Sequence, residues 1–246
     1  MIASRSHLFY SADLILKLKC GLGFVLLLMV SPACAQEDWL WQWEPEFSYT
    51  HRLGGLWKVN AKASFLQSLT TPAEAETDRQ YQFDQAQVQF FATYSLRTNL
   101  KVSGGYYFRI NDPTETLGSH NHRLAEQFAF VSQVGGRRWA NRLRLEQRFQ
   151  DQGYVNRARY RVSFDVPLNG ERIDPGEKYL IVSDEWLFSF TSRQSESQNR
   201  LYLGIGWFAN PERKTEVGVQ YRLGGIGSED LSNTLWFTTA FYWNQP

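Results

Sequence analysis

Arginine is concentrated on the polar faces of two neighbouring segments in the middle of the chain. Six arginines alternate with apolar or neutral residues over 141–149 and 157–166, namely Arg142, Arg144, Arg148, Arg157, Arg159 and Arg161. Arg200 and Arg222 occupy similar positions in two later segments. The guanidinium group stays charged in proteins, and its planar fork fits carboxylate and phosphate groups. This residue type at this spacing predicts an anion-binding surface.

Two interpretations of these arginines stay open at this point. If they face the interior of a barrel, they form a basic stripe that guides small anionic solutes, as charged rings do in pores. Alternatively, they pair with carboxylates and plug the barrel, and the candidate partners are Glu126, Glu146, Glu185 and Glu216. The two arginine-rich segments themselves hold only Glu146 and Asp165, so other segments must supply further negative charge.

A catalytic reading rests on Ser119, His120 and His122, with Glu126 nearby, as in a lipid hydrolase or acyltransferase at a barrel rim. No G-x-S-x-G elbow accompanies them. The pair His120 and His122 supplies at most two metal ligands on one face of a strand. We therefore predict a protein without catalytic residues, metal ion or cofactor.

The elements that position these residues follow the period of two that is typical of β-strands. The alternation predicts an all-β protein with strands near 39–51, 56–67, 81–94, 100–110, 122–134, 138–149, 157–166, 178–190, 198–208, 214–223 and 232–243. Most of these candidates have about ten or more residues, whereas strands of soluble sheets usually have about five or six. A tilted strand that crosses a bilayer needs about nine to eleven residues.

The connections between the predicted strands alternate in length. Residues 95–99, 135–137 and 209–213 form tight turns, whereas 68–80, 111–121, 191–197 and 224–231 form longer polar connections. Only 167–177 is long where a short turn is expected. Short turns at one end and long loops at the other are typical of antiparallel outer-membrane β-barrels. The pair Gly135-Gly136 predicts a tight hairpin turn.

Barrels of single bacterial chains usually have an even number of strands, while the pattern contains eleven candidates. We therefore expect ten strands, with residues 39–51 as an extra piece near the rim or in the lumen, or twelve strands. The aromatic residues, 15% of the chain, fall largely near strand ends, where they suit the two bilayer interfaces.

The first 35 residues have the layout of a secretory signal peptide. Lys17 and Lys19 precede the apolar run 21–30, and Ala33-Cys34-Ala35 provides an A-x-A cleavage site. We expect a signal peptide over 1–35 and a barrel over 36–246 in the bacterial outer membrane, with membrane lipid and small anionic solutes as partners. Cleavage removes both cysteines, which excludes a disulfide framework. The near balance of 26 basic and 25 acidic residues favours no nucleic-acid partner.

Several short motifs resemble a bacterial family known as domain of unknown function 2490. Residues 142–149 read RLRLEQRF, residues 157–161 read RARYR before Pro167-Leu168, and residues 199–204 read NRLYLG. The resemblance spans most of the expected mature chain. It implies an outer-membrane β-barrel and supplies no catalytic residues.

Overall fold

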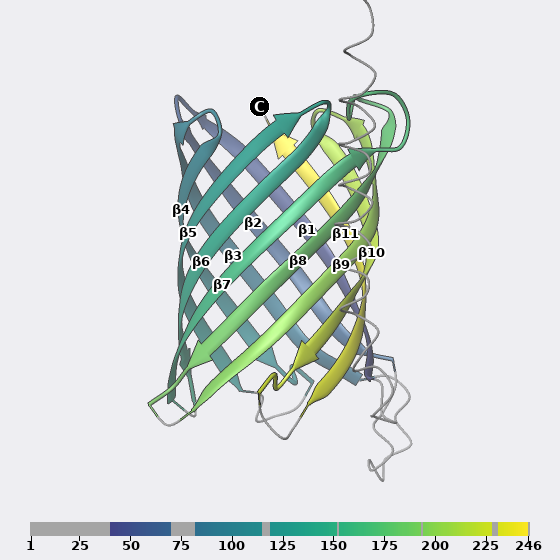
Figure 1. Ribbon diagram of the computed structural model, residues 1–246. Coiled ribbons are helices and arrows are strands. Elements are labelled where there is room, and N and C mark those ends of the chain that lie inside the picture. The colour runs from purple at the N-terminus through teal and green to yellow at the C-terminus, as the bar shows by residue number, and fades with distance from the viewer. Residues whose placement is uncertain are drawn as a thin grey trace, which may run out of the picture. The chain divides into compact units, whose positions relative to one another are not determined.

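The computed structural model describes residues 40–69, 82–114, 119–151, 153–192, 194–227 and 231–245. Over these ranges the chain forms one closed β-barrel, in which the strands are strongly tilted (Figure 1). Its strands are β1 (Leu40–Gly54), β2 (Trp57–Ser68), β3 (Gln82–Arg97), β4 (Leu100–Asn111), β5 (His120–Val134), β6 (Arg137–Gln150), β7 (Gly153–Pro167), β8 (Glu177–Phe190), β9 (Ser195–Asn210), β10 (Arg213–Gly224) and β11 (Ser232–Gln245). Within these ranges no helix is long and apolar enough to span a membrane.

The all-β prediction is confirmed, and each predicted strand is present with boundaries within a few residues of those expected. The expected signal peptide lies outside the described residues. Ten antiparallel pairs join sequence neighbours from β1 to β11, because short connections bring consecutive strands side by side. The turn at Gly135-Gly136 is confirmed, and both glycines have positive φ angles (55° and 75°), as the favoured two-residue hairpin requires.

The strand count differs from both predicted values, because the described residues form eleven strands. The segment near 39–51 is not an extra piece at the rim or in the lumen. It is β1, a full strand of the wall, which pairs antiparallel with β2 and parallel with β11. A parallel closing pair allows an odd number of strands, since the two closing strands then run in the same direction.

β1 contains a proline, which interrupts its hydrogen bonding with β2. Pro45 has no N–H to donate, and the antiparallel register with β2 passes over residues 44 and 45. The parallel register with β11 continues through the same residues, pairing Pro45 with Thr239. The seam with β11 therefore holds β1 where its other ladder is interrupted.

The two ends of the barrel have different connections. The end at the top of Figure 1 has the turns after β1, β3, β5 and β9, together with the longer β7–β8 connection and the C-terminus. The opposite end has the connections after β2, β4, β6, β8 and β10, most of which are longer. We refer to these as the short-turn end and the long-connection end.

We expect an engineered disulfide to report the parallel seam. The change Phe47→Cys with Phe241→Cys, in a chain whose Cys20 and Cys34 are replaced by Ser, places two thiols at directly paired positions. Oxidation should link them and make the barrel resistant to unfolding, which gel mobility with and without reductant measures.

The matched control is Phe47→Cys with Phe237→Cys, because Phe237 pairs with Trp43 four residues away along the seam. Four residues span about 13 Å in a strand, too far for a disulfide. Equal crosslinking of the two variants would contradict the register.

Candidate functional site: an arginine-lined barrel interior

Alternate residues of every strand point into the barrel, and the interior they line is highly polar. All eight arginines predicted from the sequence line a single interior cavity of ≈ 480 Å³: Arg142, Arg144, Arg148, Arg157, Arg159, Arg161, Arg200 and Arg222. Ten arginines and Lys62 line this cavity, against five glutamates. Glu146 is 1% exposed and lies beside these arginines; the basic residues still outnumber the acidic ones when it is counted.

Two buried carboxylates anchor the middle of the interior. Arg159 bridges them, since its Nη1 donates to Glu146 at 2.8 Å and its Nη2 donates to Glu185 at 2.6 Å. Arg142 also donates to Glu185, at 2.7 Å. We call Arg142, Arg144, Arg159, Glu146 and Glu185 the carboxylate belt.

The same belt includes Arg144, whose Nη1 lies 3.8 Å from Glu146. Arg144 is held from the other side, because its Nε and Nη2 donate to Gln127 at 3.0 and 2.6 Å and its Nη1 donates to the Tyr107 hydroxyl. Its guanidinium also lies 5.1 Å from the centre of the Phe91 ring, within cation–π range. A planar, multiply bonded arginine of this kind is fixed in one orientation.

The strand register sets arginines directly opposite one another at four places. The opposed pairs are Arg123 and Arg148, Arg142 and Arg161, Arg144 and Arg159, and Arg200 and Arg222. Like charges at directly opposite positions destabilise a sheet unless a counter-charge lies between them. Glu146 meets both members of the pair Arg144 and Arg159. For the other three pairs, a carboxylate of the described part of the chain lies within 4 Å of one arginine only.

A second set of arginines is oriented by neutral groups. We call Arg109, Arg123, Arg148, Arg157, Arg200 and Arg222 the arginine ring; each lies near the long-connection end of its strand. In all of them except Arg148, the Nε group donates to a neutral side-chain oxygen. The acceptors, in the order of these five arginines, are Gln87, Asn121, Ser189, Gln198 and Gln220. Amide and hydroxyl acceptors hold a guanidinium in place and leave its positive charge uncompensated.

Carboxylates approach the arginine ring at longer distances. Glu146 lies 3.5 Å from Arg148, and Glu44 lies 3.8 Å from Arg222. Among the residues that the structure describes, no carboxylate lies within 4.0 Å of Arg109, Arg157 or Arg200. The ring therefore keeps most of its positive charge, whereas the belt neutralises much of its own.

Sequence reasoning missed two members of the ring, Arg109 and Arg123. Each is the single arginine on the inward face of its strand, so neither stood out as part of a run. The signal was present in the alternation, because Tyr107, Arg109 and Arg123 share the inward face of the neighbouring strands β4 and β5. Glu44 lies 3.8 Å from Arg222, and its role could not be predicted from a segment expected to be an extra piece outside the wall.

Three of the four predicted acidic partners face inward, in two different surroundings. Glu146 and Glu185 meet arginines in the belt. Glu216 also faces inward, but it accepts hydrogen bonds from Lys214, Tyr179 and Tyr242 instead of from an arginine. This cluster lies toward the short-turn end.

The prediction that Glu126 is a lumen partner is wrong. The inward residues of β5 around this position are Arg123, Ala125 and Gln127, so Glu126 has the opposite parity and is exposed on the outer wall. A single-residue step in a strand moves a side chain to the other face, and the local charge of the segment does not reveal that parity.

The candidate catalytic residues do not converge. His120 and His122 face the outer wall of β5, where both rings lie against Phe108, and His122 also shares a hydrogen bond with the Tyr106 hydroxyl. Ser119 accepts a hydrogen bond from Asn111 at 2.8 Å. In the described ranges no group of three or more His, Cys, Asp or Glu side chains is placed to hold a metal ion.

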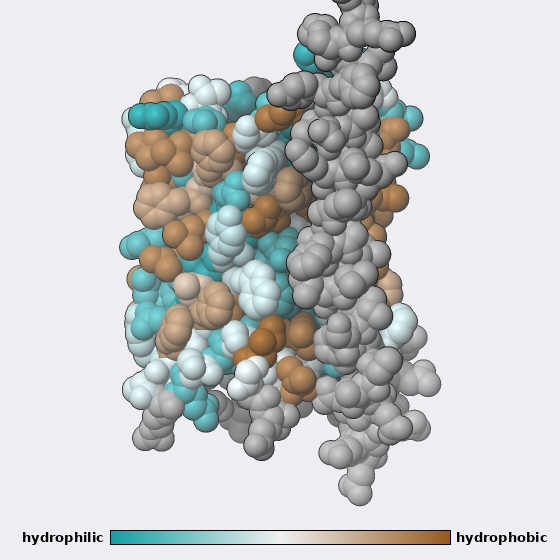
Figure 2. Space-filling model, viewed as in Figure 1, coloured by the Kyte–Doolittle hydropathy of each residue, from teal (hydrophilic) through white to brown (hydrophobic). Residues whose placement is uncertain are grey.

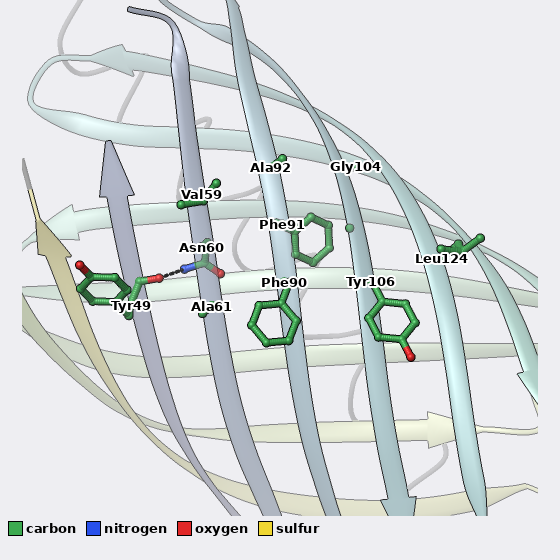
Figure 3. A pocket seen from close by; sticks show the side chains of 11 residues that line it. Tyr49, Val59, Asn60, Ala61, Phe90, Phe91, Ala92, Gly104, Tyr106 and Leu124 are labelled. Atoms are coloured by element: carbon green, nitrogen blue, oxygen red, sulfur yellow. Dashed lines mark hydrogen bonds between the residues drawn. The ribbon is translucent and has the colours of Figure 1, made fainter. Parts of the chain in front are cut away.

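The outer wall has an apolar hollow of its own, of ≈ 580 Å³, across β1 to β5. Figure 3 shows Phe90, Tyr106 and Leu124 around a floor where Ala92 and Gly104 offer little or no side chain. The hollow thus results from small residues between larger aromatic ones. It lies on the opposite side of the wall from the arginines.

We expect Glu146→Gln to destabilise the barrel, because it leaves Arg144, Arg148 and Arg159 without their shared counter-charge. Breaking a buried ion pair from one side costs about 3–5 kcal/mol. Denaturant unfolding of the detergent-folded protein measures the loss. The matched control is Glu126→Gln on the outer wall, where no such loss is expected; equal losses in both variants would contradict the belt.

Comparison with known proteins gives one match. A family model described as protein of unknown function (DUF2490) matches residues 37–231. No curated protein and no solved structure matches the chain. Since the matched region covers most of the barrel and well over half of the sequence, the chain belongs to the DUF2490 family.

Proposed function

We propose that this protein is a non-catalytic outer-membrane β-barrel that admits small anionic solutes into its arginine-lined interior. Support for a membrane environment comes from the outer wall. Large apolar side chains are exposed on β1, β3, β5, β6 and β8, among them Phe47, Phe90, Phe128, Leu145 and Phe188. Figure 2 shows such residues spread across one face of the barrel. Soluble proteins rarely expose apolar surface on this scale.

The strand lengths support the same environment. The described strands have 12 to 16 residues, and about nine to eleven residues suffice for a tilted strand to cross a bilayer. The difference between the two ends of the barrel is also typical of outer-membrane barrels, whose short turns face the periplasm. The expected signal peptide over 1–35 would deliver the chain to that membrane.

The observation that carries the anion proposal is the set of neutral acceptors behind the arginine ring. If these arginines served only to hold the barrel together, carboxylates would be the stronger partners. Instead, Gln87 accepts from both Nε and Nη2 of Arg109 at 3.0 and 2.8 Å, and Gln198 accepts from the same two atoms of Arg200 at 2.9 and 2.7 Å. Oriented, uncompensated guanidinium groups are what an incoming anion needs.

A second candidate is a closed barrel with a structural or surface-interaction role, and the carboxylate belt favours it. Barrels of eight strands are filled by side chains, and barrels of sixteen leave a channel, so eleven strands allow either outcome. In a closed barrel, Glu146 and Glu185 would complete a plug with Arg142, Arg144 and Arg159. In the open barrel that we propose, the belt is the constriction and the ring lies on its long-connection side.

We expect the purified barrel, refolded in detergent and inserted in a planar bilayer, to give discrete current steps with a preference for chloride over potassium. In the variant Arg109→Gln, Arg200→Gln, Arg222→Gln the reversal potential in a salt gradient should move toward zero, because three positive charges of the ring are removed. The matched control is Arg138→Gln, since Arg138 is paired with Asp165 at 2.7 Å near the short-turn end.

Folded protein without current steps would overturn the pore and favour the closed barrel. Steps with unchanged selectivity in the triple variant would remove the ring from the conduction path. Circular dichroism of each variant in detergent establishes that the barrel is intact.

A further inference from the structure

We propose that four arginines of the ring form a binding site for a phosphoryl oxyanion, either free phosphate or the phosphate of a larger molecule. The site comprises Arg109, Arg123, Arg148 and Arg157. The inference rests on the proposed function, because it requires an interior that anions enter. It adds the location of the anion within the barrel and its chemical class.

The register places these four side chains in an unbroken arc on four consecutive strands. Arg123 of β5 is directly opposite Arg148 of β6. Arg109 of β4 is opposite Asn121, one inward position from Arg123, and Arg157 of β7 is opposite Glu146, one inward position from Arg148. Directly opposed residues have Cβ atoms about 5 Å apart, and diagonal neighbours about 7–8 Å. Four guanidinium groups at these spacings can reach one small ligand together.

Arg123 has a donor that no side chain uses. The residue is 2% exposed, its Nε donates to Asn121 at 2.8 Å, and its Nη2 is buried without a hydrogen-bond partner among the described residues. A buried charged donor without an acceptor is unfavourable, and native structures rarely retain one. Since Arg123 lines the cavity, an acceptor that enters the cavity would complete its hydrogen bonding.

The remaining members of the arc are poised in a similar way. Arg109 is oriented by Gln87 and Arg157 by Ser189, and both acceptors are neutral. Glu146 lies 3.5 Å from Arg148 and is shared with Arg159, which it meets at 2.8 Å, so one carboxylate faces the four arginines of the arc from the belt. The arc therefore combines excess positive charge with fixed geometry.

The chemistry of the arc selects a phosphoryl group over smaller or singly charged anions. A carboxylate carries a single negative charge, which balances the charge of one guanidinium group. A phosphate group carries about −1.5 to −2 charges near neutral pH and three or more acceptor oxygens. It can accept from three or four guanidinium groups at once and balance more of their charge.

Other groups that face the arc are consistent with this assignment. Across the cavity lie Arg200 and Arg222, which add positive charge, and Glu44 and Glu196, which limit it. The arc itself lies beside the β4–β5 and β6–β7 connections, at the long-connection end and on one side of the carboxylate belt. A ligand that enters at this end meets the arc before the belt.

The test is calorimetric titration of the detergent-folded, full barrel with inorganic phosphate and, separately, with acetate. We expect saturable phosphate binding, much weaker acetate binding, and roughly ten- to a hundredfold weaker phosphate binding in Arg123→Gln, as loss of a charge-assisted hydrogen bond implies. Arg123→Gln also relieves the opposition with Arg148, so the barrel should still fold. Arg157→Gln is the second variant, with the same expected direction, and Arg138→Gln is the control.

Each outcome decides a separate claim. Equal affinity for phosphate and acetate, or unchanged phosphate affinity in both variants, would overturn the phosphate site. The proposed function would still stand if the same preparation prefers chloride over potassium. Absence of both selectivity and phosphate binding would overturn the two together. Titration with glycerol 3-phosphate separates the sources: tighter binding than inorganic phosphate indicates a phosphate ester, and weaker binding indicates the free ion.

Discussion

The confinement of many permanently charged guanidinium groups in a narrow barrel is the constraint on which the rest of this structure depends. Ten arginines line one cavity, and arginine does not lose its proton to escape burial. Every such charge therefore needs a partner that offsets the loss of hydration. The positions of glutamate, glutamine, asparagine and tyrosine in the interior follow from this need.

The barrel meets the need in two ways, and the difference between them bears on function. In the carboxylate belt, Glu146 and Glu185 share the arginines of facing strands, and Arg159 links the two. In the arginine ring, side-chain amides and a hydroxyl accept from five of the six Nε groups and leave the charge in place. The ion pairs of the belt hold the middle of the barrel together. The arginines of the ring are held in place by neutral groups, and this leaves their charge available to an anion on the long-connection side.

The wall has the opposite character on its outer face. Trp43 and Phe47 of β1 and Phe241 and Trp243 of β11 are exposed there, so both strands of the closing seam present aromatic side chains to the outside. Glu126 is an exception, a carboxylate exposed among apolar residues beside Gly104. We find no partner for it within the described ranges that would explain its position.

The sequence by itself determined the strands, their approximate ends and the face on which the eight predicted arginines lie. These are local properties: alternation has a period of two, and Arg142, Arg144 and Arg159 display it within a few residues. The Gly135-Gly136 turn was equally readable, because positive φ angles are a property of the residues themselves.

Only the tertiary structure decided how the barrel closes and which charges meet. The parallel pairing of β1 with β11 joins residues almost 200 positions apart in sequence, such as Phe47 and Phe241. No local pattern specifies that partner. The pairing of β1 with β11 also determines the strand count and places Glu44 beside Arg222. Likewise, Glu185 meets Arg142 because the register of the closed sheet brings inward residues of different strands together. Glu126 has the parity of Leu124 and Phe128 and therefore lies on the outer face.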